Sequence, residues 1–373
     1  MAREEGHPMA QYRAAVIGHT GRGAYGHGLD TVYQALDNVD IVAVADADAD
    51  GLAAAGGRLS VSQPARYADY RQMLDSESLD IVSVCPRWVG EHHDMVIAAA
   101  NSGARAIYCE KSFAQTLRHA DEMIAACEEN GVTIAVAHQN RFHPHIVKMR
   151  EMIDAGDIGD IREVHGYGKQ DRRGGGEDLV VLGTHIFDLM RLFCGDPRWV
   201  EAAVLVDGRD AAPGDALDGA EEVGLLMGDF LRATYGFGNG VLGTFVSRRE
   251  GSHFGGRSMG IQVEGTEGIL TFRGDYLMRY PHGCWSPSPS DEKWQVVGEP
   301  SAVPGGITSL NAPLVRDLID AMENGRQPQS SGVGARWSLE MILGVYAAHR
   351  SGRTALPTAE RDHPLRRWEG LGA

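Results

Sequence analysis

The sequence of 373 residues predicts an α/β fold, with an N-terminal Rossmann domain followed by a C-terminal α/β domain that has a mostly antiparallel open sheet. Two observations carry this prediction. Over roughly the first 140 residues, short continuous apolar runs alternate with helical stretches, which is typical of a parallel sheet covered on both faces. After Phe142 the runs lengthen and several alternate between apolar and polar residues, as half-buried antiparallel strands do. We therefore expect two domains, residues 1–140 and 141–373.

The first domain is expected to alternate strands and helices. Helices are predicted over 89–100 and 117–129, and the pairs Ser102-Gly103 and Asn130-Gly131 are suitable helix stops. A further helix is expected after the glycine-rich turn that follows the first strand. The strands are expected at 14–17, 41–45, 81–84, 106–109 and 133–137.

The second domain begins with a basic, amphipathic segment over 145–155. Two helices are expected near the end of the chain, at 309–324 and 334–351, and the Pro-, Ser- and Gly-rich stretch 281–306 is predicted to be a long loop. Strands are expected at 161–168, 199–206, 222–227, 231–237, 241–248 and 259–272.

The turn after the first strand has the composition of a dinucleotide-binding loop. Glycines let the backbone approach a pyrophosphate, and a following helix would present free N–H groups to it. Thr20 stands where the second glycine of the usual pattern falls, and a structural turn without a ligand is the alternative. The candidate cofactor residues here are Gly18, Thr20, Gly21, Arg22 and Gly23.

Asp46 ends the second apolar run and indicates which dinucleotide binds. A carboxylate at this position accepts hydrogen bonds from both ribose hydroxyls of the adenosine and repels a 2′-phosphate. No basic residue follows it directly, because the next four residues are Ala47, Asp48, Ala49 and Asp50. The sequence therefore favours NAD over NADP, although these acids could also be solvated loop charges.

The bulk composition narrows the class of protein. A formal net charge of −16 argues against nucleic acid or an anionic membrane surface as a partner. No apolar run approaches the length of a membrane span, and the first residues lack the apolar core of a signal peptide. The five cysteines form no CxxC pair, which favours buried thiols in a reducing compartment. We expect a soluble cytoplasmic protein.

Four short motifs, taken with the N-terminal turn, resemble the Gfo/Idh/MocA family of glucose–fructose oxidoreductases and inositol dehydrogenases. Glu110-Lys111-Ser112 is similar to the family's Glu-Lys-Pro, and Val82–Pro86 followed by His92 is similar to its Thr-Pro…His segment, with about two extra residues. The other two are Asn140-Arg141-Phe142-His143-Pro144, similar to Asn-x-Arg-x-x-Pro, and Gly183-Thr184-His185-Ile186-Phe187-Asp188, similar to Gly-x-His-x-x-Asp.

The resemblance implies a function and an assembly. It implies NAD(P)-dependent oxidation or reduction of a hydroxyl on a sugar or cyclitol, and a C-terminal sheet that pairs subunits into a homodimer or homotetramer. On the cofactor side it implies Pro86, His92, Glu110 and Lys111, with Lys111 near both the nicotinamide and the substrate.

Oxidation of an alcohol by NAD requires a base for the hydroxyl proton and a donor for the developing alkoxide. His185 is the expected base, because its ordinary pKa is close to the operating pH, and Lys111 is the expected donor. The chain departs from the family at Val181, where relatives with dehydrogenase activity usually carry an aspartate one turn before the histidine. Asp188, Glu177 or Asp178 could take over its part.

The charged run from Lys169 to Asp178 lies between a predicted strand and the helix of His185, where it would face a polyhydroxylated substrate. We expect no metal, since no carboxylate lies at ligand spacing from His143 and His145. The candidate substrate contacts are Lys111, Arg141, Lys169, Arg172, His185 and Asp188.

Three functions follow, in order of preference. The first is an NAD-dependent dehydrogenase of a sugar, sugar acid or cyclitol. The second is a hydrolase or lyase that keeps NAD tightly bound and oxidises the sugar transiently, which the departure at Val181 makes more credible. The third is a non-catalytic sensor of cofactor or sugar, which the presence of both Lys111 and His185 disfavours.

Overall fold

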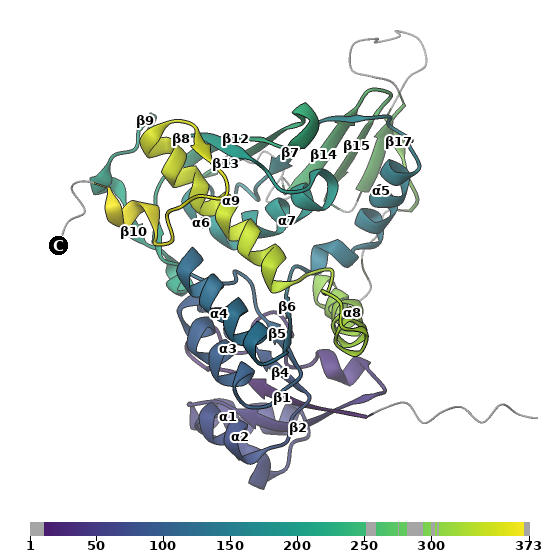
Figure 1. The fold of residues 1–373 in the computed structure, drawn as a ribbon, viewed down its shortest axis with the longest axis vertical. Coiled ribbons are helices and arrows are strands. Elements are labelled where there is room, and N and C mark those ends of the chain that lie inside the picture. The colour runs from purple at the N-terminus through teal and green to yellow at the C-terminus, as the bar shows by residue number, and fades with distance from the viewer. Residues whose placement is uncertain are drawn as a thin grey trace, which may run out of the picture. The chain divides into compact units, whose positions relative to one another are not determined.

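The computed structural model describes residues 11–250, 259–274, 276–281, 294–299, 303 and 306–368. The chain divides into two compact units (Figure 1). The first unit combines residues 1–110, 123–137 and 311–329, and the second combines 111–122, 138–310 and 330–373. The predicted domain boundary at 140 thus lies close to one point where the chain passes from the first unit to the second. The sequence did not predict that residues 111–122 belong to the second unit, or that residues 311–329 belong to the first.

The first unit contains the predicted parallel sheet, with strand order β3-β2-β1-β4-β5-β6. Its central strands are buried along most of their length, because helices cover both faces of a parallel sheet. The strands are β1 (Tyr12–Ile17), β2 (Val39–Ala45), β3 (Arg66–Tyr67), β4 (Ile81–Val84), β5 (Ala106–Cys109) and β6 (Thr133–Val136). Its helices include α1 (Ala49–Arg58), α2 (Tyr70–Ser76), α3 (His92–Ala100) and α8 (Asn311–Asn324).

Helix α8 packs on β5 and β6, although it follows them by about 180 residues in sequence. Its first residue, Asn311, is buried, accepts a hydrogen bond from the Tyr108 hydroxyl at 2.9 Å, and donates one to the carbonyl of His27 at 2.9 Å. The helix itself was predicted, but its place in the first unit was not. Helix α4 (Leu117–Glu129) is divided between the units.

The helix expected directly after β1 is absent from residues 18–38, all of which the structure describes. These residues form successive turns, and the one regular element is a 3₁₀ helix over Val32–Ala35. Gly21, Gly23, Gly26 and Gly28 all have positive φ, a conformation that no α-helix contains. The prediction of a helix N-terminus at the glycine-rich turn is therefore wrong.

The second unit is built on a ten-stranded sheet in the order β17-β16-β15-β14-β7-β13-β12-β8-β18, with β9 also paired to β8. All of its pairs are antiparallel except the parallel pair β7 and β13, which confirms the mostly antiparallel sheet. The main strands are β7 (Ile161–Tyr167), β8 (Trp199–Val206), β12 (Phe230–Gly236), β13 (Leu242–Arg248), β14 (Gly260–Gly265), β15 (Ile269–Arg273) and β16 (Tyr276–Tyr280). The short strands are β9 (Arg209–Asp210), β17 (Gln295–Val296) and β18 (Thr354–Ala355).

Helices cover one face of this sheet. Helix α7 (Gly183–Cys194) packs on β7 and β14, and α9 (Gly332–Ser351) packs on β8 and on α7. The Phe187 ring of α7 lies 4.7 Å from that of Phe245 and 5.5 Å from that of Tyr235, centroid to centroid, and all three are fully buried. This aromatic cluster fixes α7 on the sheet. The other helices are α5 (Pro144–Asp154) and α6 (Gly176–Val181).

Several predicted elements differ in detail. The run 259–272 is a hairpin of two strands rather than one strand. The run 222–227 contains only the two-residue strand β11 (Leu225–Leu226), which pairs with β10 (Leu217–Asp218). Much of the predicted loop 281–306 lies outside the described residues, and its described part includes β17.

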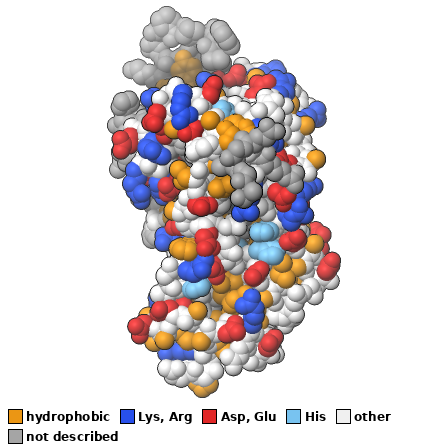
Figure 2. All heavy atoms as spheres, turned by 90° about the vertical axis from the view of Figure 1, so that its left-hand side faces the viewer, with side chains coloured by type: hydrophobic (Ala, Val, Ile, Leu, Met, Phe, Trp, Pro, Cys, Tyr) orange, Lys and Arg blue, Asp and Glu red, His pale blue; other side chains and the backbone are white. Residues whose placement is uncertain are grey.

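The surface carries charges of both signs. On the face shown in Figure 2, Lys and Arg side chains alternate with Asp and Glu side chains, so the described residues of that face form no extended patch of one sign. Binding of a polyanion normally requires clustered cations. Within the described residues, no helix combines the length and the apolar composition that a membrane span requires.

Candidate active site

Asp46 directly follows β2 and is held in place by the glycine-rich turn. Its carboxylate accepts hydrogen bonds from the amide and hydroxyl of Thr20, at 3.0 and 2.7 Å, and from the amide of Asp48 at 3.0 Å. The residue is 1% exposed. Thr20, at the position where a glycine is usual, therefore orients the carboxylate through its side chain.

A cavity of about 410 Å³ opens beside Asp46 at the carboxyl edge of the parallel sheet, where folds of this kind bind ligands. Its wall is rich in carboxylates, which is a poor environment for an additional 2′-phosphate. The polar and aromatic side chains that line it are His19, Asp46, Asp69, Tyr70, Arg71, Glu91 and Asp94.

Two glycines of the turn are required by close packing. A Cβ at Gly18 would lie 2.2 Å from the ring of Tyr25. Gly23 has φ +92°, and a Cβ there would lie 2.3 Å from the backbone nitrogen of Arg87. The glycines at these positions thus bring the turn against its neighbours, whether or not a ligand is bound.

Arg22 lies between an acid and an aromatic ring. Its Nε is 2.8 Å from Oε1 of Glu91, and its guanidinium lies 4.6 Å from the centre of the Trp88 ring. The second oxygen of Glu91 is 3.1 Å from Nδ1 of His19.

Pro86, His92 and Glu110 follow β4 and β5 at the same edge of the sheet. Nε2 of His92 lies 2.7 Å from the Pro86 carbonyl, and His92 is fully buried, so it fixes the loop after β4. Glu110 is also fully buried, with Oε1 2.9 Å from Nδ1 of His27. These contacts are between protein groups, so direct contact of Pro86, His92 and Glu110 with a cofactor stays a prediction.

Lys111 and His185 both belong to the second unit and are 5% and 7% exposed. Lys111 opens the turn after β5, and its peptide bond with Ser112 is cis. The hydroxyl of Ser112 donates a hydrogen bond of 2.7 Å to the carbonyl of Val180, which joins this turn to α6. Serine thus adds a contact that the motif's proline could not make. His185 lies in the first turn of α7.

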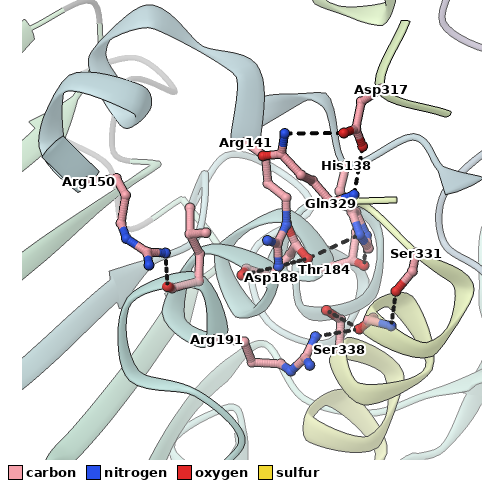
Figure 3. Close-up of polar contacts among 12 residues, drawn as sticks. His138, Arg141, Arg150, Thr184, Asp188, Arg191, Asp317, Gln329, Ser331 and Ser338 are labelled. Atoms are coloured by element: carbon pink, nitrogen blue, oxygen red, sulfur yellow. Dashed lines mark hydrogen bonds and ion pairs between the residues drawn. The ribbon is translucent and has the colours of Figure 1, made fainter. Parts of the chain in front are cut away.

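His138 brings the two predicted catalytic residues into one neighbourhood. Its ring lies edge-on to that of His185, with centroids 5.6 Å apart and planes at 74°. Its Nε2 is 2.8 Å from the Thr184 hydroxyl (Figure 3). Burial lowers the pKa of His138 to about 4, and the positive charges of Arg141 and Lys111 act in the same direction against the opposing effect of Asp188. The sequence analysis missed this residue, although its position just after the last strand of the parallel sheet was a usable signal.

Arg141 and Asp188, both predicted as substrate contacts, bind each other. Nε of Arg141 donates to Oδ2 of Asp188 at 2.6 Å and Nη2 donates to Oδ1 at 2.9 Å (Figure 3). Burial works against ionisation of Asp188, but Arg141 and His138 outweigh it and lower the pKa of the carboxyl. The pair ties the 138–142 segment to α7, and a substrate contact by either residue stays a prediction.

The other acids proposed to replace the aspartate missing at Val181 differ in their surroundings. Asp178 is fully buried and accepts hydrogen bonds from the amides of Lys169 and Gln170 at 3.2 and 3.1 Å and from the Ser247 hydroxyl at 2.5 Å. Burial raises its pKa. Asp178 therefore organises the loop after β7. Burial also raises the pKa of Glu177, which is only partly buried.

The predicted substrate loop contains a short helix and side-chain ion pairs. Residues 176–181 form α6, and the side chains of Lys169 and Arg173 form ion pairs with Asp171, at 3.4 and 2.9 Å. Arg172 is exposed. No group of metal-ligating side chains occurs among the described residues.

Comparisons with known proteins agree with this architecture. Residues 12–138 match a family model described as an oxidoreductase family with an NAD-binding Rossmann fold, and residues 146–271 match the GFO/IDH/MocA C-terminal domain. The chain is 28% identical to a D-apiose dehydrogenase of Paraburkholderia graminis, over 95% of this chain and 92% of that protein. It is 21% identical to a D-apiose dehydrogenase of Rhizobium rhizogenes, over 93% and 97%.

Among solved structures, a levoglucosan dehydrogenase in complex with NADH and levoglucosan superposes with a TM-score of 0.74 at 18% identity. The match covers 93% of this chain and all of that one. Both halves of the chain therefore match one family in both sequence and fold. The chain belongs to the Gfo/Idh/MocA family of NAD(P)-dependent oxidoreductases.

Proposed function

We propose that this dehydrogenase oxidises a hydroxyl of a sugar, sugar acid or cyclitol with NAD, and that Lys111 and His185 act at the reacting oxygen. The observation that carries the proposal is the setting of these two side chains in the second unit. Both are more than nine-tenths buried, His185 contacts the ring of His138, and the charge of Lys111 acts on that same ring. An acid–base group and a cation thus both lie, buried, around the ring of His138.

The chemistry assigns a separate task to each group. When NAD is bound, its nicotinamide accepts the hydride from the carbon that bears the hydroxyl. The imidazole of His185 removes the hydroxyl proton, a general-base role for which histidine is the side chain used most often. The ammonium of Lys111 donates a hydrogen bond to the oxygen as negative charge develops on it. In the reverse direction His185 returns the proton.

NAD rather than NADP is supported by the cavity beside Asp46. The carboxylate of Asp46 is fixed by Thr20 and Asp48, and Asp69, Glu91 and Asp94 outnumber Arg71, the one described Lys or Arg that lines the same cavity. A 2′-phosphate would add about two negative charges to these acids, whereas ribose hydroxyls can donate hydrogen bonds to Asp46.

The relatives suggest which substrates to test first. The proteins named above are dehydrogenases of apiose and levoglucosan, and a further relative is a D-xylose 1-dehydrogenase (NADP⁺) from Haloferax volcanii. We propose an aldose or anhydro-sugar, screened as D-apiose, D-xylose, levoglucosan and myo-inositol with NAD⁺ or NADP⁺. NADH formation at 340 nm with at least one sugar is the expected result. Cofactor binding without NADH formation across a broad panel of sugars and cyclitols would contradict the proposal.

We also propose that the protein acts in the cytoplasm as a homodimer or homotetramer through the second unit's sheet. Cys85, Cys109 and Cys127 are buried free thiols, which suits a reducing compartment. Large apolar side chains are exposed on or beside the sheet, at Leu242, Tyr276, Trp294 and Val296. Light scattering of the purified protein tests the assembly, and a monomer at micromolar concentration would contradict it.

A further inference from the structure

The glycine-rich turn lacks the usual source of positive potential for a pyrophosphate. In a dinucleotide-binding unit, the N-terminus of the following helix supplies free N–H groups and the positive end of the helix dipole. Residues 18–31 contain no helix here. Several amides of the turn are also committed: those of Gly18, His19 and Ala24 donate to the carbonyls of Ala45, Ala24 and His19, respectively. The amide of Thr20 donates to Asp46.

The acidic cavity beside the turn increases this need for a cation. Glu91, Asp69 and Asp94 line the same space as Asp46, and a pyrophosphate carries about two negative charges at neutral pH. Arg71 is the one Lys or Arg among the described residues that line this cavity, against four carboxylates, so the excess of like charge would still oppose entry of the pyrophosphate.

Arg22 is the cation that the turn itself carries. It lies within the candidate loop, and its side chain is 37% exposed. Glu91 is one of its partners, at 2.8 Å, and the Trp88 ring packs against it at 4.6 Å. Arginine binds phosphate oxygens through two or more parallel N–H groups, so it can exchange one acidic partner for another.

We propose that Arg22 supplies the positive charge for the pyrophosphate in place of a helix N-terminus, and that Glu91 holds Arg22 until the dinucleotide displaces it. Glu91 thereby acts as an internal competitor for the phosphate. While Arg22 is bound to Glu91, the charge of Glu91 is neutralised. Once Arg22 turns to the phosphate, Glu91 still has His19 as a partner, with Nδ1 of His19 3.1 Å from its other carboxylate oxygen. The inference rests on the dinucleotide site of the proposed function.

The test is calorimetric binding of NAD⁺, ADP-ribose and adenosine, none of which requires a sugar substrate. Arg22→Met should weaken ADP-ribose binding by about tenfold or more, as expected for loss of a charge-assisted hydrogen bond. Glu91→Gln should strengthen it by about three- to fivefold, the range of a partly exposed ion pair. Adenosine, which has no phosphate, should bind within twofold of wild type in both variants.

The double variant separates competition from simple repulsion. If Glu91 acts mainly by holding Arg22, then Glu91→Gln should give a clearly smaller gain in the Arg22→Met background than in wild type, because only the repulsion by its charge is then relieved. A gain of the same size in that background would overturn the proposed competition, and unchanged ADP-ribose binding in Arg22→Met would overturn the role of Arg22. Arg13→Met and Glu77→Gln, which break an ion pair of 3.2 Å elsewhere in the same unit, are the matched controls. A wild-type protein that binds neither NAD⁺ nor adenosine would instead refute the dinucleotide site itself.

Discussion

Replacing Asp188 by asparagine is predicted to destabilise the second unit strongly. The substitution keeps the size of the side chain and removes the charge that neutralises Arg141. Asp188 is 1% exposed and receives two hydrogen bonds from the guanidinium, at 2.6 and 2.9 Å. The Arg141 side chain is 12% exposed, so its charge would be left without a counter-ion and with little access to water.

The expected loss can be bounded from this geometry. Removing one partner of a buried ion pair typically costs about 3–5 kcal/mol. Because Arg141 keeps a small exposed surface and a weaker bond of 3.3 Å to the carbonyl of residue 188, we expect the lower end, about 3 kcal/mol. The free energy of unfolding is measured by urea denaturation, followed by circular dichroism.

An exposed pair on the neighbouring helix α5 provides the control. Arg150 and Asp154 form an ion pair of 2.8 Å whose side chains are 46% and 58% exposed, so Asp154→Asn should cost less than about 0.5 kcal/mol. The double variant Arg141→Met with Asp188→Asn should recover part of the loss, since no charge remains buried. Equal effects of Asp188→Asn and Asp154→Asn would refute the argument that burial gives the Arg141–Asp188 pair its importance.

Three further predictions follow from the same contacts. Thr20→Val removes the 2.7 Å hydrogen bond to Asp46 and should weaken NAD⁺ binding by about fivefold in calorimetry. Thr20→Ser, which keeps the hydroxyl, should not weaken it. Equal affinities of the two variants for NAD⁺ would refute this role of the hydroxyl. Gly18→Ala places a Cβ 2.2 Å from the Tyr25 ring and should lower the free energy of unfolding by about 1–3 kcal/mol in urea denaturation. Gly57→Ala in α1, where the new Cβ meets open space, should not lower it. Similar stabilities of the two variants would contradict the packing argument. Burial lowers the pKa of His138 to about 4, whereas in the unfolded chain the same side chain takes up its proton near pH 6.5, so this residue should make stability fall by about 1.4 kcal/mol per pH unit between pH 6.5 and 4. His138→Gln should reduce that slope in urea denaturation at several pH values. An unchanged slope would exclude His138 as the cause.

The parallel sheet was predictable because its signal is local. A buried parallel strand must be largely apolar on both faces, and the runs within β1, β4, β5 and β6 are short and mostly apolar. The two-residue strand β3 gave no such signal, because two residues cannot establish a period.

The helix after β1 was wrongly predicted because the motif's usual context outweighed the residues themselves. Five glycines between residues 18 and 28 favour turns, and four of them adopt positive φ. The placement of α8 could not be predicted for a different reason. Its amphipathic pattern shows that one face is buried, but nothing in that pattern says which sheet covers the face.

The motifs predicted individual site residues but not the contacts between them. They proposed Asp46, Lys111 and His185; the last two are buried in the second unit, and the roles of all three stay predictions. The structure shows what a linear motif cannot contain: that Arg141 is paired with Asp188, and that His138 packs against His185. Such pairings join segments more than 40 residues apart, so they depend on the fold.

The central claim is that His185 and Lys111 perform the chemistry, and that His185 does so without holding the cofactor. The most direct test is to compare kcat, with the best sugar of the panel, against the calorimetric Kd for NAD⁺ in wild type, His185→Asn and Lys111→Met. The account predicts a loss of kcat of about a hundredfold or more in each variant, with the Kd for NAD⁺ within about threefold of wild type in His185→Asn. Turnover close to wild type in either variant, with the protein folded, would contradict the assignment.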